Sequence, residues 1–148
     1  MLKTRIFFII SLLAISLATF ASCDKDEQLL DPTKLPAEAQ SFIDSNFPTT
    51  SIKSVVKEYD DFSYHYEVYL ADGTSLEFDK RGEWTDVQNR VSGVPDSVVP
   101  EKILSYVTTN YSEAFIVDIE RERQYNVELN TDLDLDFSLD GDFIRIDY

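Results

Sequence analysis

The chain has 148 residues and a formal net charge of −15, because 13 lysines and arginines face 28 aspartates and glutamates. Such an acidic surface repels the phosphates of nucleic acids and anionic lipid headgroups, which excludes nucleic acid as a partner. The single cysteine excludes an intrachain disulfide, and the length fits one compact domain behind an N-terminal leader.

The N-terminal residues 1–22 have the pattern of a secretory signal peptide. Two basic residues precede a short apolar run, and small residues lead directly into Cys23. Residues 20–23, FASC, resemble a bacterial lipobox, with Phe20 in the place usually taken by leucine. The sequence therefore predicts an exported outer-membrane lipoprotein that is held to the membrane by a lipid on Cys23. Cleavage near Ala21 with a free thiol is the alternative.

The predicted lipidation site opens a short acidic segment. Residues 23–34 contain the run DKDE and Pro32, and they lack apolar periodicity. An acidic run at this place resembles the export tag of Bacteroidetes lipoproteins, which would put the protein on the periplasmic side of the membrane or on the cell surface. We expect a flexible tether over this segment.

Two segments of the remaining chain align with each other, and each begins with a predicted helix. Residues 35–47 lie over residues 99–111, with a proline at the first helical position of both, where its missing N–H is not needed. In both segments apolar residues recur at the spacing of one buried helical stripe. The sequence thus predicts two repeats, residues 35–89 and residues 97–148.

A β-hairpin follows each predicted helix. In residues 66–84, YEVYLADGTSLEFDKRGEW, apolar and polar side chains alternate, and the Asp72-Gly73 step suits a tight turn because glycine tolerates positive φ. Residues 125–143 repeat the pattern. With a strand-like run before each hairpin and a further strand after it, each repeat reads as one helix followed by four strands.

Two such repeats can join as one sheet or as two sheets packed face to face. Periodicity favours one sheet, because Asp132, Asp134 and Asp136 alternate with apolar residues and leave only one face fit for burial. The predicted fold class is α+β, with two tandem α-β-β-β-β repeats. About eight antiparallel strands would form one curved sheet, with two helices packed on one face.

Four runs carry a resemblance to a known family. LPAEAQSFIDSNFP and YEVYLADGTSLEFDKRGEW, repeated as VPEKILSYV and LDFSLDGDFIRID, resemble the PepSY-like family of β-lactamase-inhibitor-like proteins found in Bacteroidetes. The resemblance covers residues 35–148. It implies a two-repeat fold in which paired helices back one concave antiparallel sheet. It implies no established activity, because a fold does not by itself carry a function.

The sequence offers little for catalysis. His65 is the one histidine, and it shares a predicted strand face with Glu67, its conceivable partner in general-base chemistry. No nucleophile motif or ligand set accompanies the pair. We therefore expect a solvated histidine, no enzymatic activity and no cofactor.

A calcium loop is suggested by the series Asp132-x-Asp134-x-Asp136, which has the first three oxygen donors of an EF-hand. Phe137 stands where the loop needs glycine, and Phe143 stands where it needs a bidentate glutamate. The alternating leucines also hold this stretch extended. We expect no metal site there.

Acidic residues and a tyrosine gather on the predicted open face of the sheet. Tyrosine supplies apolar contact area at low entropic cost, and carboxylates steer a cationic partner. We therefore expect a non-enzymatic envelope module that binds a protein or peptide, most simply a basic one. The alternatives are an inhibitor of a peptidase or β-lactamase, a structural component of an envelope assembly, and an ordinary solvated face. The predicted binding face comprises His65, Glu67, Tyr69, Glu77, Asp79, Glu128, Asp134 and Asp136.

Overall fold

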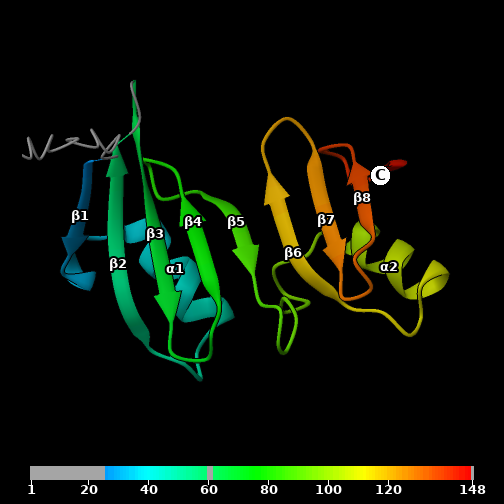
Figure 1. Cartoon of the computed structure of the whole chain (residues 1–148), viewed down its shortest axis with the longest axis horizontal. Coiled ribbons are helices and arrows are strands. Elements are labelled where there is room, and N and C mark those ends of the chain that lie inside the picture. The colour runs from blue at the N-terminus through cyan, green and yellow to red at the C-terminus, as the bar shows by residue number, and fades with distance from the viewer. Residues whose placement is uncertain (1–25, 60–61, 148) are drawn as a thin grey trace, which may run out of the picture.

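The structure is a computed structural model that describes residues 26–59 and 62–147 (Figure 1). The signal peptide and Cys23 of the sequence prediction lie outside the described residues. No helix in this part of the chain is long and apolar enough to cross a membrane. The helices are the 3-10 turn η1 (Pro32–Lys34), α1 (Ala37–Asn46) and α2 (Glu101–Asn110). The strands are β1 (Asp26–Leu30), β2 (Ile52–Tyr59), β3 (Tyr64–Leu70), β4 (Ser75–Phe78), β5 (Trp84–Gln88), β6 (Ile116–Arg121), β7 (Tyr125–Leu129), β8 (Asp134–Phe137) and β9 (Phe143–Asp147).

The nine described strands form one antiparallel sheet, and their order in the sheet is their order in the chain. The two repeats join where β5 pairs with β6, with Val87 opposite Ile119. The prediction of one continuous sheet is confirmed. The alternative of two packed sheets is wrong, because the apolar residues of both repeats share one face of one sheet.

The ninth strand is β1, which the sequence analysis did not predict. A flexible tether was expected over residues 23–34, whereas Asp26–Leu30 pair antiparallel with β2 along their whole length and η1 follows. Leu30 packs partly against the core, while Leu29 points to the other face and is 79% exposed. With one inward apolar side chain, β1 has no readable alternation. Backbone pairing with β2 holds it in place.

The hydrophobic core lies between the sheet and the two α-helices. Figure 1 shows α1 behind β2 to β4 and α2 beside β8 at the other end of the sheet. The strand residues that face the helices, among them Val68, Leu76, Val127 and Leu135, are at most 2% exposed. Burial of apolar surface is the main force that stabilises such a fold, at roughly 1.5–3 kcal/mol for each fully buried large side chain.

The two repeats dock their helices through equivalent aromatic contacts. In the first repeat, the Phe42 ring of α1 meets the Phe78 ring edge to face, with centroids 5.7 Å apart. In the second repeat, the Tyr106 ring of α2 meets the Phe137 ring in the same way at 5.4 Å. Edge-to-face pairs are favourable beyond their buried area, so the same interaction fixes both helices.

The turns of the first hairpin use glycine where the sequence predicts it. Gly73 has a φ of +91°, and the Asp72 carboxylate accepts a hydrogen bond from the Thr74 N–H at 3.0 Å. Gly82, in the following turn, has a φ of +88°, and a Cβ there would lie 2.7 Å from Pro36 Cβ. The second turn therefore needs glycine both for its backbone and for contact with the start of α1.

Candidate functional site

The sheet face opposite the helices carries a row of carboxylates that crosses four strands. The strand register places Glu67 opposite Glu77, Glu77 opposite Asp86, and Asp86 opposite Glu120. Side chains at opposed positions of neighbouring strands are about 5 Å apart at Cβ. We call Glu67, Glu77, Asp86 and Glu120 the first acidic row.

A second acidic row runs beside the first, farther along the sheet. Asp118 of β6 lies opposite Glu128 of β7, which lies opposite Asp134 of β8. Asp147 of β9 follows opposite Asp134. We call the two rows together the acidic face. The helices pack against the other side of the sheet, so no element of the described residues covers it.

Burial and repulsion between neighbours disfavour the charged form of the central carboxyls. Burial is the main cause for Asp86, whose pKa rises to about 7, and the charges of Asp118 and Glu77 add to it. Burial also raises the pKa of Asp118 and that of Glu120. Like charges directly opposite each other destabilise a sheet, so this arrangement works against fold stability.

Two arginines form ion pairs with carboxylates of the second repeat. Arg90 forms a bidentate pair with the Glu128 carboxylate at 2.7 and 2.6 Å, and these hydrogen bonds lower the pKa of Glu128. Arg145 Nε lies 2.7 Å from Asp136 Oδ2, in an ion pair without the direction of a hydrogen bond. Within the described residues, no lysine or arginine forms such a pair with the first acidic row.

A hollow of about 300 Å³ lies over the first acidic row. At its side, Tyr69 Oη donates a hydrogen bond to Glu67 Oε2 at 2.6 Å. This hydrogen bond is the main cause that raises the pKa of Tyr69 to about 12. The residues that line the hollow include Glu67, Tyr69, Ser75, Glu77, Asp86 and Gln88.

Two residues of the predicted binding face are placed differently from the expectation. Asp79 Oδ1 accepts hydrogen bonds from the N–H groups of Arg81 and Glu83 at 2.8 and 2.9 Å, so it shapes a turn. Asp136 lies beneath Arg145 and is 1% exposed, so its carboxylate is not offered to a partner. The others, His65, Glu67, Tyr69, Glu77, Glu128 and Asp134, lie on the open side, where their role in binding stays a prediction.

The acidic residues of this side that sequence reasoning missed include Glu58, Asp86, Asp118, Glu120 and Asp147. A signal was present for two of them, because Asp86 precedes the buried Val87 and Asp118 precedes the buried Ile119. Strand alternation therefore puts both carboxylates on the open face. Their closeness to each other depends on the pairing of β5 with β6, which alternation does not reveal.

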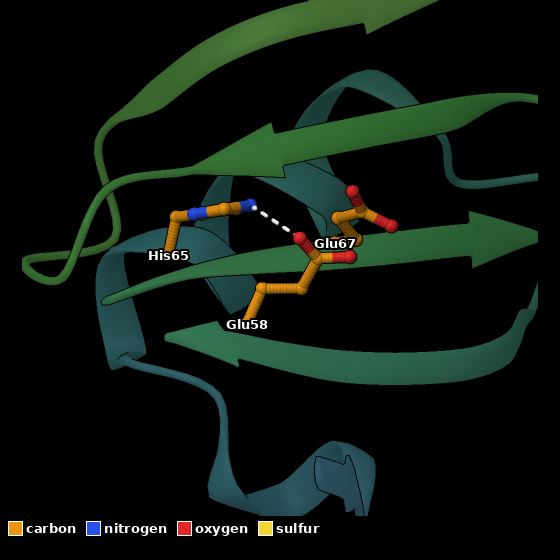
Figure 2. Close-up of side chains that lie close together, drawn as sticks. All are labelled: Glu58, His65 and Glu67. Carbon is orange, nitrogen blue, oxygen red and sulfur yellow. Dashed lines mark ion pairs between the residues drawn. The ribbon is translucent and has the colours of Figure 1, made fainter. Parts of the chain in front are cut away.

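A compact cluster lies at the β2–β3 end of this face (Figure 2). Glu58 of β2 stands opposite His65 of β3, and Glu58 Oε2 lies 3.5 Å from His65 Nε2. Glu67 is two residues further along β3, and one ligand atom of each residue lies within 4.8 Å of the others. The His65 side chain is 17% exposed, so the expected solvated histidine is instead largely buried and paired. We call Glu58, His65 and Glu67 the His65 cluster.

The fold and this site define a two-repeat α+β protein with an open acidic sheet face. The chain belongs to the PepSY-like family, because the family model described as "Putative beta-lactamase-inhibitor-like, PepSY-like" matches residues 64–145. This confirms the resemblance that the sequence runs carry. A comparison with curated proteins found no match.

Solved structures of Bacteroides proteins share the fold. One, from Bacteroides thetaiotaomicron, is described as a "putative calcium-regulated periplasmic protein"; it is 35% identical, with a TM-score of 0.80, over 83% of this chain and 98% of that chain. A "putative periplasmic protein" of the DUF2874 family from Bacteroides vulgatus is 38% identical, with a TM-score of 0.79, over 86% and 100%. None of these descriptions names an enzymatic activity.

Proposed function

We propose that this protein is an exported, non-enzymatic binding module and that its acidic face binds a basic segment of a partner protein. The first acidic row is the observation that carries the proposal. Four carboxylates stand opposite one another on successive strands without a lysine or arginine partner among the described residues. The description of similar proteins as periplasmic supports export.

The hollow over the first acidic row suits a lysine or arginine side chain. A cation placed there faces Glu67, Glu77 and Asp86 together, all of which line the hollow. Its charge lowers the pKa of Asp86 again, because a nearby opposite charge favours the ionised carboxyl. Binding of the basic segment is therefore coupled to proton release from Asp86, and it weakens as salt screens the charges.

A charge-matched pull-down from envelope extract tests this proposal. One variant replaces Glu67, Glu77 and Asp86 by their amides, and the control replaces the exposed residues Asp44, Glu101 and Glu113 in the same way. Each variant replaces three carboxyl groups, and at pH 8, where Asp86 is mostly ionised, the two lose nearly the same net charge. We expect the first to lose a partner with a basic contact segment and the second to retain it; equal capture by both would contradict the proposal.

Inhibition of a peptidase or β-lactamase is the second candidate, and the family description supports it. In this case the basic segment belongs to the target enzyme, and the bound acidic face keeps substrate out of that enzyme's active site. Titration of the purified protein into a panel of periplasmic hydrolases should then reduce one activity in proportion to occupancy. An unchanged panel would remove this candidate and leave the broader binding proposal in place.

We also propose that a lipid on Cys23 anchors the protein to the outer membrane. The support is the order of features in the sequence, with an apolar run, small residues and then the single cysteine. Cys23 precedes Asp26, the first residue of β1, by three residues, so such an anchor would hold the sheet close to the membrane surface.

A further inference from the structure

We propose that the His65 cluster is a binding site for a divalent metal ion of the Zn²⁺ class. Glu58, His65 and Glu67 come from two paired strands, and Figure 2 shows their side chains on the same side of these strands. Imidazole nitrogen and carboxylate oxygen are both ligands of Zn²⁺, and three protein ligands leave the fourth position for water or a further ligand. This site shares Glu67 with the contacts of the proposed basic segment, while Glu58 and His65 are not among those contacts.

The present distances are close to those that the metal requires. Zinc holds nitrogen and oxygen ligands at about 2.0–2.2 Å in a tetrahedron, which separates two ligand atoms by about 3.4 Å. His65 Nε2 and Glu58 Oε2 are 3.5 Å apart. Glu67 Oε is within 4.8 Å of both ligand atoms, so we expect its carboxylate to move closer when the ion binds.

Charge favours a cation at this place. The Glu58 side chain is 9% exposed, and the second carboxylate of the cluster lies close by. On the adjoining strand, Glu27 of β1 stands directly opposite Glu58. A divalent ion compensates the charges of the Glu58 and Glu67 carboxylates in this partly buried setting.

The ligand types select the class of metal. Calcium and magnesium take oxygen ligands almost exclusively, while imidazole nitrogen is a preferred ligand of zinc and its transition-metal neighbours. Residues that ligate a metal are commonly hydrogen-bonded by neighbouring side chains. Tyr69 has this role for Glu67, because its hydroxyl donates a 2.6 Å hydrogen bond to Glu67 Oε2. This bond holds the Glu67 carboxylate beside the cluster.

The single histidine makes the site directly observable. We suggest NMR spectroscopy of the full chain carrying Cys23→Ser, so that no thiol competes for the metal, purified without a histidine tag. Every imidazole signal then belongs to His65. We expect one equivalent of Zn²⁺ to shift the His65 ring signals and equal amounts of Ca²⁺ or Mg²⁺ to leave them in place. Unchanged signals with Zn²⁺, or equal shifts with Ca²⁺, would overturn the proposal.

Calorimetric titration with Zn²⁺ distinguishes specific binding at the His65 cluster from non-specific electrostatic attraction of the ion to the acidic face. His65→Gln and Glu67→Gln should each weaken binding by at least about tenfold, and Tyr69→Phe by about tenfold, as loss of a supporting hydrogen bond does. Glu77→Gln is the matched control, because it removes one charge from the same face outside the cluster. If it weakens Zn²⁺ binding as much as Glu67→Gln does, the ion is held by diffuse charge and the proposed site is wrong.

Discussion

Replacement of Asp86 by asparagine should stabilise the protein at neutral and alkaline pH. Asp86 is half-buried on the open face between Glu77 and Glu120, and burial raises its pKa from the ordinary 3.8 to about 7. Asparagine keeps the shape of the side chain and removes the charge. The destabilising effect of an ionised carboxyl at this position should therefore disappear.

The size of the effect follows from the pKa. One pKa unit corresponds to about 1.4 kcal/mol, so the difference between 3.8 and about 7 sets a ceiling of about 4 kcal/mol. Asp86 keeps some contact with solvent, which screens its interactions, and we expect about 1–2 kcal/mol. A carboxyl whose folded pKa is raised makes the folded state bind more protons than the unfolded state. The free energy of unfolding of the wild type therefore falls between pH 4 and 7.

Urea unfolding of the wild type and Asp86→Asn between pH 4 and pH 8 measures this difference. The two proteins should have nearly equal free energies of unfolding at pH 4, and the variant should be more stable at pH 8. Asp44→Asn, on the exposed side of α1, is the control and should show no such dependence on pH. A variant that gains nothing at pH 8 would refute the reasoning about the first acidic row.

Three further predictions concern the fold and the anchor. Gly82→Ala should lower the free energy of unfolding by about 1–3 kcal/mol. Gly73→Ala should lower it less, because Gly73 has a similar φ but an added Cβ there meets open space. Equal losses of stability would exclude the clash with α1. Phe78→Ala should cost about 3–5 kcal/mol in urea unfolding, because the ring is fully buried against α1, and a loss below about 1 kcal/mol would contradict that packing. Cys23→Ser should move the protein from the membrane fraction to the soluble fraction of cells, and unchanged fractionation would contradict lipidation.

The repeats and their hairpins were predictable because each depends on short-range signals. Alternation identified β3 and β4, and the glycines of the turns identified where the chain reverses. The strand β1 was not predictable in the same way. Leu30 is its one inward apolar residue, so the strand has no apolar alternation, and backbone pairing with β2 holds it in place.

The sequence could predict which residues lie on the open face of the sheet, but not which of them lie opposite each other on neighbouring strands. Alternation put Glu67 and Glu77 on the open side, while the opposition of Asp86 and Glu120 depends on strands that are separated by α2 in the chain. Asp136 is buried beneath Arg145 of the neighbouring strand, a contact that alternation within one strand does not reveal. Register between strands is the information that a single sequence lacks.

Site-specific photo-crosslinking in cells tests the central claim, that the acidic face is the binding surface, most directly. A photoreactive residue at Ser75, which lines the hollow over the first acidic row, should form a discrete adduct with a partner protein through a basic segment. The same residue at Ser41, on the exposed side of α1, should form none. An adduct at Ser41 without one at Ser75 would contradict the account.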